Sequence, residues 1–522
     1  MKDLKLLLLV LAVVAGGMYT LPASSQQQAV KRPNIIFILS DDHGLQATGA
    51  YGNKLVRTPN IDRIAREGAL FKNALVTNSI CGPSRATFIT GKYSHKNGYK
   101  MNEGKFNTDQ LLFPALLQQN GYQTAWIGKW HLGSLPKGFD YYDVLPGQGN
   151  YYNPDFIKSG NDTVRHHGYV SNIITELTKN WLDGRDKEKP FFLVVGEKAA
   201  HRSWEPDIQD LGAFDNVTFP IPATFYDTYE NRKAAADQDM SIEKTLDLRN
   251  DLKVHALKPN PSSWGLYGRL DSVQKHAIAD YYEGKVSKEF DDKKLSGKAL
   301  TEWKYQRLMR DYFSVVNSLD RNIGEILDYV EKNGLKDNTV IVYASDNGFY
   351  LGEHGWFDKR FIYEESLKIP LLIRYPGVVK PSSTITPIVL NNDWGATMLD
   401  IAGVKVPEEI QGASFLPLLK ATAGKGKQPE WRKDAYYHYY EFPQPHHVHP
   451  HFGLRSTQYT LVRFYGAINS WELYDLNKDP NQLNNLYGGK GYEAITADLK
   501  NRLKKLIIKY DDQEALEIFN KN

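Results

Sequence analysis

The sequence predicts an α/β fold in which helices cover both faces of a mostly parallel sheet, with a small antiparallel α+β subdomain at the C-terminus. Several short segments are apolar throughout, as strands buried on both faces of a parallel sheet usually are. Segments with helical periodicity alternate with them, which is the order of βαβ units. After about residue 430, short strands with turns between them replace this order, so we expect a second sheet there.

Five apolar segments are expected to form strands of the main sheet: 34–39, 123–127, 191–195, 339–344 and 370–374. Proline directly after Thr58 favours a helix that starts there. Two more helices are expected over 113–119 and 312–333, and each is followed by a glycine that favours its end, Gly121 and Gly334.

We expect three regions after the N-terminus. Residues 31–420 form the main α/β domain, and the polar segment at about 214–305 is an insertion of irregular segments and short helices over its core. A linker follows residue 420, and residues 430–522 form the C-terminal subdomain. Its strands are expected at 436–441, 459–465 and 471–475, and a final amphipathic helix follows them.

Residues 1–25 have the pattern of an export signal peptide, in which lysines precede the apolar run 6–16 and small residues follow at 23–25. The run is shorter than the about 20 apolar residues of a membrane span. No cysteine follows that could carry a lipid, and no later stretch suits a bilayer crossing. We therefore expect a bacterial protein that is periplasmic or secreted, with no membrane anchor.

The charge balance excludes one class of partner. The 522 residues include 64 basic and 61 acidic ones, for a net charge of +3. A protein that binds nucleic acid would be strongly basic, so we expect no nucleic-acid partner. A local cluster of cations could still hold an anionic substrate.

Cys81 is the only cysteine of the chain, so no internal disulfide can form. A lone cysteine is often a small buried hydrophobe. Here Gly82, Pro83 and Ser84 favour a turn, and Arg85 adds a cation that is rarely buried without a partner. A thiol in an electropositive turn is a candidate reactive thiol.

Acidic pairs follow two of the expected strands. Asp41 and Asp42 come directly after strand 34–39, and Asp346 with Asn347 comes after strand 339–344. Ligands bind beyond the carboxyl ends of strands in open α/β sheets, and these hard oxygens suit Ca²⁺ or Mg²⁺. Either pair alone could be a helix cap or turn. Two pairs at two strand ends favour a metal site.

Further charged groups lie at loop positions that suit an anionic substrate: Arg85, Lys129, His131, His201 and Lys359. They could stabilise developing negative charge and move protons. The alternative for each is ordinary surface charge.

The run Cys81-Gly82-Pro83-Ser84-Arg85-Ala86, with Thr90-Gly91 at its end, resembles the signature of the type I sulfatase family. The resemblance covers most of 34–420 and includes the Gly-Lys-Trp-His-Leu-Gly motif at 128–133. It implies a fold similar to alkaline phosphatase. It also implies that a formylglycine-generating or maturase enzyme oxidises Cys81 to formylglycine (3-oxoalanine), whose hydrate is the catalytic nucleophile.

The resemblance implies a role for each group. Asp41, Asp42, Asp346 and Asn347 bind Ca²⁺ beside residue 81, and residue 81 itself is the fifth metal ligand. Arg85 orients and activates the nucleophile. Lys129 and Lys359 hold the sulfate. His201 contacts the substrate and gives a proton to the leaving sugar oxygen, and His131 takes a proton from the second hydroxyl of the hydrate, which releases sulfate.

Three stretches resemble the glucosamine-6-sulfatase branch: 436–443, 356–360 around Lys359, and the Glu-Leu-Tyr-Asp-Leu segment at 472–476. They imply a 6-O-sulfated N-acetylglucosamine substrate in a sulfated glycan. Asp358 and Arg360 flank Lys359 and are expected to contact sugar hydroxyls, and His451 ends a histidine-rich tract that suits a sugar-binding rim. That tract could also bind a transition metal or consist of scattered surface histidines.

Three alternatives stay open. The chain could be a sulfatase for galactosamine or aryl sulfates, or a phosphate or phosphonate ester hydrolase of the same superfamily. It could also be a non-catalytic protein that binds sulfated glycans, although the intact site motifs argue against this.

Overall fold

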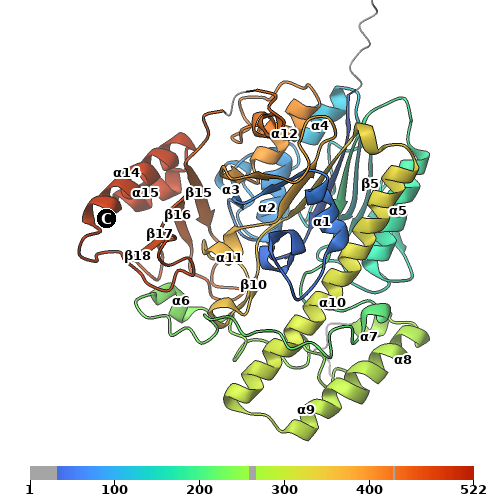
Figure 1. Ribbon diagram of the computed structural model, residues 1–522, viewed down its shortest axis with the longest axis horizontal. Helices are drawn as coiled ribbons and strands as arrows, with labels where there is room; N and C mark the ends of the chain where they lie inside the picture. The colour runs from blue at the N-terminus through green and yellow to red at the C-terminus, as the bar shows by residue number, and fades with distance from the viewer. Residues whose placement is uncertain (1–31, 258–265, 427–428, 522) are drawn as a thin grey trace, which may run out of the picture. The chain divides into compact units, whose positions relative to one another are not determined.

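The computed structural model describes residues 32–257, 266–426 and 429–521 (Figure 1). The expected signal peptide, residues 1–25, lies outside these residues. Within the described ranges, no helix combines the length and the apolar character needed to cross a membrane.

The main sheet, within the described residues, contains ten strands: β1 Asn34–Ser40, β2 Ala69–Phe71, β4 Gln123–Lys129, β5 Tyr141–Leu145, β6 Asp155–Lys158, β7 Thr163–Arg165, β8 Phe191–Gly196, β9 Thr339–Ser345, β12 Leu371–Arg374 and β13 Ser383–Ile385. Their order is β13-β2-β12-β9-β1-β8-β4-β5-β6-β7. The strands from β9 to β5 run parallel, and antiparallel pairs join β12 to β9 and β5 to β6. The expected mostly parallel sheet is therefore confirmed.

Helices cover both faces of this sheet (Figure 1). One face carries α1 Pro59–Arg66, α5 Val170–Gly184 and α10 Gly297–Lys332. The other carries α2 Cys81–Thr90, α4 Phe113–Gln119, α12 Asp393–Ile401 and α13 Leu416–Thr422. Strand β1 shows why residues 35–39 are all apolar. Ile36 and Ile38 point into the first core and Phe37 into the second, because successive strand residues face opposite sides.

The C-terminal sheet is antiparallel, with the order β15-β16-β17-β18. Its strands are β15 Asp434–Tyr439, β16 His451–Ser456, β17 Tyr459–Phe464 and β18 Ser470–Asp475, and α14 Glu493–Lys509 and α15 Gln513–Asn520 follow. The sequence analysis missed β16 because Gly453 and Arg455 interrupt its apolar pattern. Arg455 is tolerated there because its guanidinium pairs with Glu364 at 2.9 Å.

Two other expectations were wrong. Gly82, Pro83 and Ser84 form the first turn of α2 rather than a loop turn, a position where proline is tolerated because the N–H has no helical partner. All ten residues of α2 are buried, so Cys81 and Arg85 belong to the core. The long helix α10 begins at Gly297, not near Tyr312, so the expected end of the insertion at residue 305 falls inside it.

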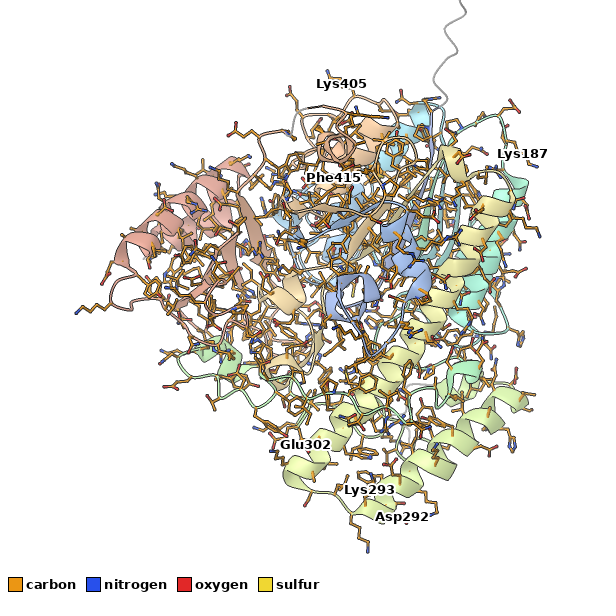
Figure 2. All side chains as sticks on the ribbon, viewed as in Figure 1. Lys187, Asp292, Lys293, Glu302, Lys405 and Phe415 are labelled. Atoms are coloured by element: carbon orange, nitrogen blue, oxygen red, sulfur yellow. The ribbon has the colours of Figure 1, made fainter. Side chains whose placement is uncertain are left out.

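The remaining elements are short: β3 Ala74–Leu75, β10 Tyr350–Leu351, β11 Phe357–Asp358, β14 Val389–Leu390, α3 Ser94–Asn97, α6 Lys233–Asp237, α7 Leu266–Arg269, α8 Ser272–Tyr281, α9 Lys288–Lys293 and α11 Glu364–Leu367. Helices α6 to α9 belong to the polar segment. Charged side chains such as Asp292 and Lys405 point outward, whereas Phe415 is buried in the core (Figure 2).

Asp320 of α10 holds the start of α1. Its carboxylate accepts hydrogen bonds from the main-chain N–H of Asn60 at 3.1 Å, from Asn60 Nδ2 at 2.9 Å and from the N–H of Ile61 at 2.8 Å. The first amides of a helix have no partner within the helix. A side chain from a neighbouring helix therefore caps α1.

We expect Asp320→Ala to lower the free energy of unfolding by about 1–3 kcal/mol, because it leaves these donors buried without an acceptor. Urea denaturation measures the change. The matched control is Asp292→Ala on exposed α9, which should change stability by less than about 0.5 kcal/mol. Equal effects of the two substitutions would contradict the capping role.

Candidate active site

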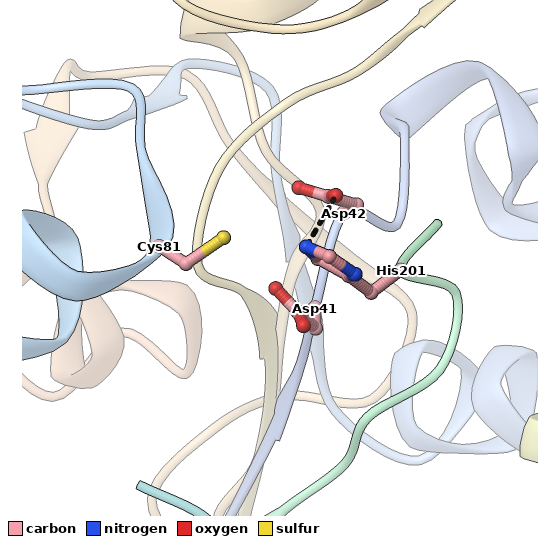
Figure 3. A group of neighbouring side chains, drawn as sticks. All are labelled: Asp41, Asp42, Cys81 and His201. Carbon is pink, nitrogen blue, oxygen red and sulfur yellow. Dashed lines mark ion pairs between the residues drawn. The ribbon is translucent and has the colours of Figure 1, made fainter. Parts of the chain in front are cut away.

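The candidate site lies beyond the carboxyl ends of the central strands. Asp41 and Asp42 follow β1, Asp346 and Asn347 follow β9, Lys129 ends β4, and the segment with His201 follows β8. Cys81 enters from the start of α2, and its side chain points toward Asp41, Asp42 and His201 (Figure 3). The candidate ligand atoms of these four residues all lie within 4.8 Å of one another.

The two acidic pairs touch each other. The N–H of Asp42 donates to Asp346 Oδ1 at 3.3 Å, and Asn347 Nδ2 donates to Asp42 Oδ1 at 2.7 Å. Among the described residues, the buried atoms Asp41 Oδ1 and Asn347 Oδ1 have no hydrogen-bond partner. Buried polar oxygens without partners are rare. The site therefore has two hard oxygens ready for a divalent cation.

Three buried cations pair with the three acids. Arg85 Nε donates to Asp346 Oδ2 at 2.8 Å, and Lys359 Nζ donates to Asp42 Oδ2 at 2.7 Å. Lys129 Nζ donates to Asp41 Oδ2. Removing one member of a buried pair leaves an uncompensated charge, so these groups are mutually dependent.

Burial and the neighbouring charges shift the pKa values of Asp41 and Asp346 in opposite directions. Burial alone would raise the pKa of Asp41, but Lys129 and Arg85 hold it well below its usual range. Burial and the charge of Asp41 raise the pKa of Asp346 to about 7, despite its contact with Arg85. The contact with Arg85 therefore offsets only part of the effect that burial and Asp41 have on the pKa of Asp346.

Cys81 is fully buried, and burial together with Asp41 raises the pKa of its thiol well above the ordinary value. The expectation of an electropositive environment that activates the thiol is thus wrong for the unmodified side chain, because carboxylates neutralise the nearby cations. Gly82 fixes the start of α2. Its N–H donates to Asn102 Oδ1 at 2.9 Å, and a Cβ would lie 2.8 Å from that oxygen.

Two histidines face the cluster. His201 Nδ1 donates to the carbonyl oxygen of Arg202 at 2.5 Å, which leaves Nε2 toward Asp42 Oδ2 at 3.9 Å. His131 Nδ1 has no partner among the described residues. Burial, followed by the charge of Lys129, lowers the pKa of both imidazoles well below 6.5. Both rings are therefore neutral at pH 7 in the substrate-free site.

Asp358 and Arg360 lie next to Lys359 and pair with each other. Two residues that the sequence analysis missed complete this group. His446 Nε2 lies 3.1 Å from Asp358 Oδ2, and Glu441 Oε2 lies 3.3 Å from Arg360 Nη2. Both belong to the aromatic and histidine-rich stretch after β15, which was the signal that could have indicated them.

The sequence analysis also missed Gln148, because no motif marks its position. Its side chain accepts a hydrogen bond from Lys129 Nζ. His451, expected at a sugar rim, is instead the first residue of β16 and fully buried. Its Nε2 accepts from the N–H of Ile362 at 3.1 Å, and its Nδ1 donates to the carbonyl oxygen of His449 at 2.8 Å. No ring nitrogen remains for a substrate, so His451 is a structural residue in this fold.

The fold and this site define a member of the sulfatase family, and the chain belongs to it. The family model "Sulfatase" matches residues 33–404, and the model "N-sulphoglucosamine sulphohydrolase, C-terminal" matches residues 352–509. The chain is 48% identical to the N-acetylglucosamine-6-O-sulfatase of Bacteroides thetaiotaomicron, over 95% of this chain and 90% of that protein. It is 28% identical to human N-acetylglucosamine-6-sulfatase, over 82% and 71% of the two chains.

Solved structures agree in fold. One, a protein in complex with its substrate D-glucosamine-2-N,6-O-disulfate, superposes with a TM-score of 0.90 at 48% identity and covers 92% of this chain and 99% of that chain. The phosphonate monoester hydrolase of Agrobacterium radiobacter superposes with a TM-score of 0.67 at 19% identity, over 92% and 96% of the chains, which is a likeness of fold alone. The expected α/β architecture with a small C-terminal antiparallel sheet is confirmed.

Proposed function

We propose that this sulfatase removes the 6-O-sulfate of N-acetylglucosamine in sulfated glycans. The observation that carries the proposal is the 48% identity, over nearly the full length of both chains, to an N-acetylglucosamine-6-O-sulfatase. The similar structure with bound D-glucosamine-2-N,6-O-disulfate supports the same class of sugar. Because that ligand carries an N-sulfate, the proposed substrate class includes N-sulfated glucosamine.

We assign Asp41, Asp42, Asp346 and Asn347 as the residues that hold Ca²⁺ beside residue 81. The unpartnered oxygens of Asp41 and Asn347 support this assignment, and oxygen ligands of this kind suit Ca²⁺. A bound divalent cation would act as a Lewis acid on the sulfate oxygens. Formylglycine, made from Cys81 by a maturation enzyme, would supply a hydrated aldehyde as the nucleophile.

Lys129, Lys359 and Arg85 provide fixed positive charge for the sulfate group. Hydrolysis of the ester increases negative charge on the leaving oxygen, and buried cations that need not reorient stabilise such charge strongly. All three side chains are almost fully buried and are held by contacts to Asp41, Asp42 and Asp346. Arg85 Nη1 also donates to the carbonyl oxygen of Lys129 at 2.6 Å, which ties two of the cations together.

His201 is the proposed general acid. The carbonyl oxygen of Arg202 fixes its Nδ1–H, so Nε2 is the nitrogen that can carry a proton to the leaving sugar oxygen. The imidazole is neutral in the buried site without substrate. An anionic sulfate ester beside it favours the protonated form. His131 is the proposed base that accepts a proton at residue 81.

Asp358 and Arg360 are the proposed contacts to the sugar. His446 and Glu441 hold these two side chains in place.

We further propose that residues 1–25 direct the chain to the periplasm or outside the cell, and that 31–420 and 430–522 are its two domains. N-terminal sequencing of the mature protein from the periplasmic fraction tests the export proposal, and a first residue before position 20 would contradict it.

The central test is a substrate screen. The enzyme, co-expressed with a maturation enzyme, should hydrolyse N-acetylglucosamine-6-sulfate with a higher kcat/KM than galactosamine-6-sulfate, 2-O-sulfated uronic acids or an aryl sulfate. Ion chromatography of released sulfate measures each rate, and mass spectrometry of the Cys81 peptide establishes conversion. If the converted enzyme cleaved a sugar other than a 6-O-sulfated glucosamine faster, the substrate assignment would be refuted.

The acid role predicts a dependence on the leaving group. His201→Ala should reduce kcat/KM by about 10²–10⁴-fold on the sugar sulfate and much less on an aryl sulfate, whose leaving group needs little protonation. Steady-state kinetics on both substrates separate the effects. Losses of the same size on both would point to a binding role instead.

The metal assignment predicts that Asn347→Ala weakens Ca²⁺ binding by removing an oxygen ligand. We expect Ca²⁺ to raise the Tm of chelator-treated enzyme, and we expect this increase to shrink in Asn347→Ala. Asn484→Ala, at an exposed position, is the matched control and should keep the full increase. A full Ca²⁺-dependent increase in Asn347→Ala, measured by differential scanning calorimetry, would exclude Asn347 as a ligand.

A further inference from the structure

A cavity of about 780 Å³ lies beside β18, the edge strand of the C-terminal sheet. Its lining includes Arg463 of β17, Trp471 of β18 and Lys500 of α14. The opposite edge strand is β15, where the N–H of His438 donates to the carbonyl oxygen of Thr77. Strands β16 and β17 lie between these two edges.

Arg463 carries a charge that no carboxylate of the described residues neutralises. The residue is 2% exposed, and its Nη1 donates only to the carbonyl oxygens of Phe464 at 3.1 Å and Ser470 at 3.4 Å. Its Nε has no hydrogen-bond partner in the described part of the chain. The other four arginines among the largest fully buried side chains each form an ion pair with an acid: Arg85, Arg232, Arg307 and Arg374.

A buried cation without a counter-charge is costly, and the desolvation of Arg463 lowers its pKa accordingly. An anion bound in the cavity would remove this cost. Because the other four arginines are paired with acids, the guanidinium of Arg463 stands apart from them, and we take its lack of an acidic partner as an indication of a bound anion.

A second cation lies over the same aromatic ring. Lys500 Nζ is 4.3 Å from the ring centroid of Trp471, and the Arg463 guanidinium is 5.3 Å from it. Lys500 Nζ donates to the hydroxyl of Tyr487 at 2.7 Å and forms no ion pair within the described residues. Cation–π contacts hold both groups in place, yet their like charges repel each other.

Glu472 of β18 is the one carboxylate among the described lining residues. Its Oε2 accepts hydrogen bonds from the hydroxyls of Tyr363 at 2.8 Å and Tyr474 at 2.7 Å, and its Oε1 has no hydrogen-bond partner among the described residues. Burial raises the pKa of Glu472 to about 7, so its negative charge only partly offsets the cations near neutral pH. The exposed Lys233, at the start of α6, adds a third cation. The cavity thus combines fixed positive charge, aromatic rings and the amides of Asn469 and Asn485.

We propose that this cavity is an accessory, non-catalytic site that binds a sulfate group of a sulfated glycan chain. Arginine and lysine together recognise sulfate-like oxyanions through charge-assisted hydrogen bonds. The volume, well above that of a single oxyanion, lies in the range of sites for small organic ligands and accommodates a sugar unit with its sulfate. The choice of a glycan over a free anion rests on the proposed function. The site would hold a long chain while its end is processed elsewhere.

The test uses the full chain with Cys81→Ser, which prevents turnover, and isothermal titration with a heparin-derived octasaccharide. Lys500→Glu should weaken octasaccharide binding by at least about tenfold, because a charge-assisted contact becomes a repulsive one. Lys505→Glu, at an exposed position of the same helix, is the matched control and should leave the Kd unchanged. Arg463→Met should reproduce the loss and is checked for folding by its Tm.

An octasaccharide Kd that is the same in Lys500→Glu and Lys505→Glu would overturn the proposal. A parallel titration with sodium sulfate separates the two sources of the anion. If Lys500→Glu abolishes sulfate binding but leaves octasaccharide binding intact, the cavity is a site for small anions and the glycan proposal fails. Turnover of monomeric N-acetylglucosamine-6-sulfate by the converted enzyme should be equal with and without Lys500→Glu, so the proposed function is tested separately.

Discussion

The parallel pairing of β1 with β9 determines where the acidic groups of the site lie. Its register places Ser40 beside Ser345, so the next residues of both strands, Asp41 and Asp346, leave the sheet at the same level. The N–H of Asp346 donates to the carbonyl oxygen of Ser40 at 3.1 Å, which continues the pairing by one step. A shift of register by one residue would send each side chain to the opposite face. The site therefore depends on the hydrophobic strands beneath it.

Charge compensation is the second constraint. The three acids and three cations of the site neutralise one another in pairs, and this explains how so many charged groups can be buried together. Two oxygens of the site, Asp41 Oδ1 and Asn347 Oδ1, have no hydrogen-bond partner among the described residues. These oxygens support the proposed cation site. The C-terminal cavity shows the reverse case, an unpaired guanidinium at Arg463.

Much of the fold and of the candidate site could be predicted from the sequence. The apolar runs indicated β1 and β9 to within one residue, and the predicted helix 113–119 has the bounds of α4, because burial on both faces and helix end signals are local properties. The charged motifs indicated the groups that the structure brings together. The first turn of α2 was missed because Gly-Pro-Ser is common in loops, and β16 was missed because a paired arginine replaces an apolar residue.

Contacts between distant segments were beyond sequence reasoning. Gln148 lies in no charged motif, and only its contact with Lys129 identifies it. His446 and Glu441 lie in a stretch that the sequence analysis noted, but their partners Asp358 and Arg360 lie about eighty residues earlier. The opposite error occurred for His451. The histidine-rich composition suggested a sugar-binding rim, but His451 is a buried residue of β16.

The order of strands in the main sheet has a consequence for how the protein matures. Asn34 of β1 and Thr339 of β9 are 305 residues apart in the chain and yet are direct neighbours. During synthesis or export, β1 can pair with β8 once residues 191–196 have emerged, but its other neighbour, β9, follows only after residue 339, and contacts of such long range form slowly. The segment from Cys81 to Thr90 is fully enclosed only in the finished fold. The proposed modification of Cys81 would therefore have to take place before the chain closes around this segment.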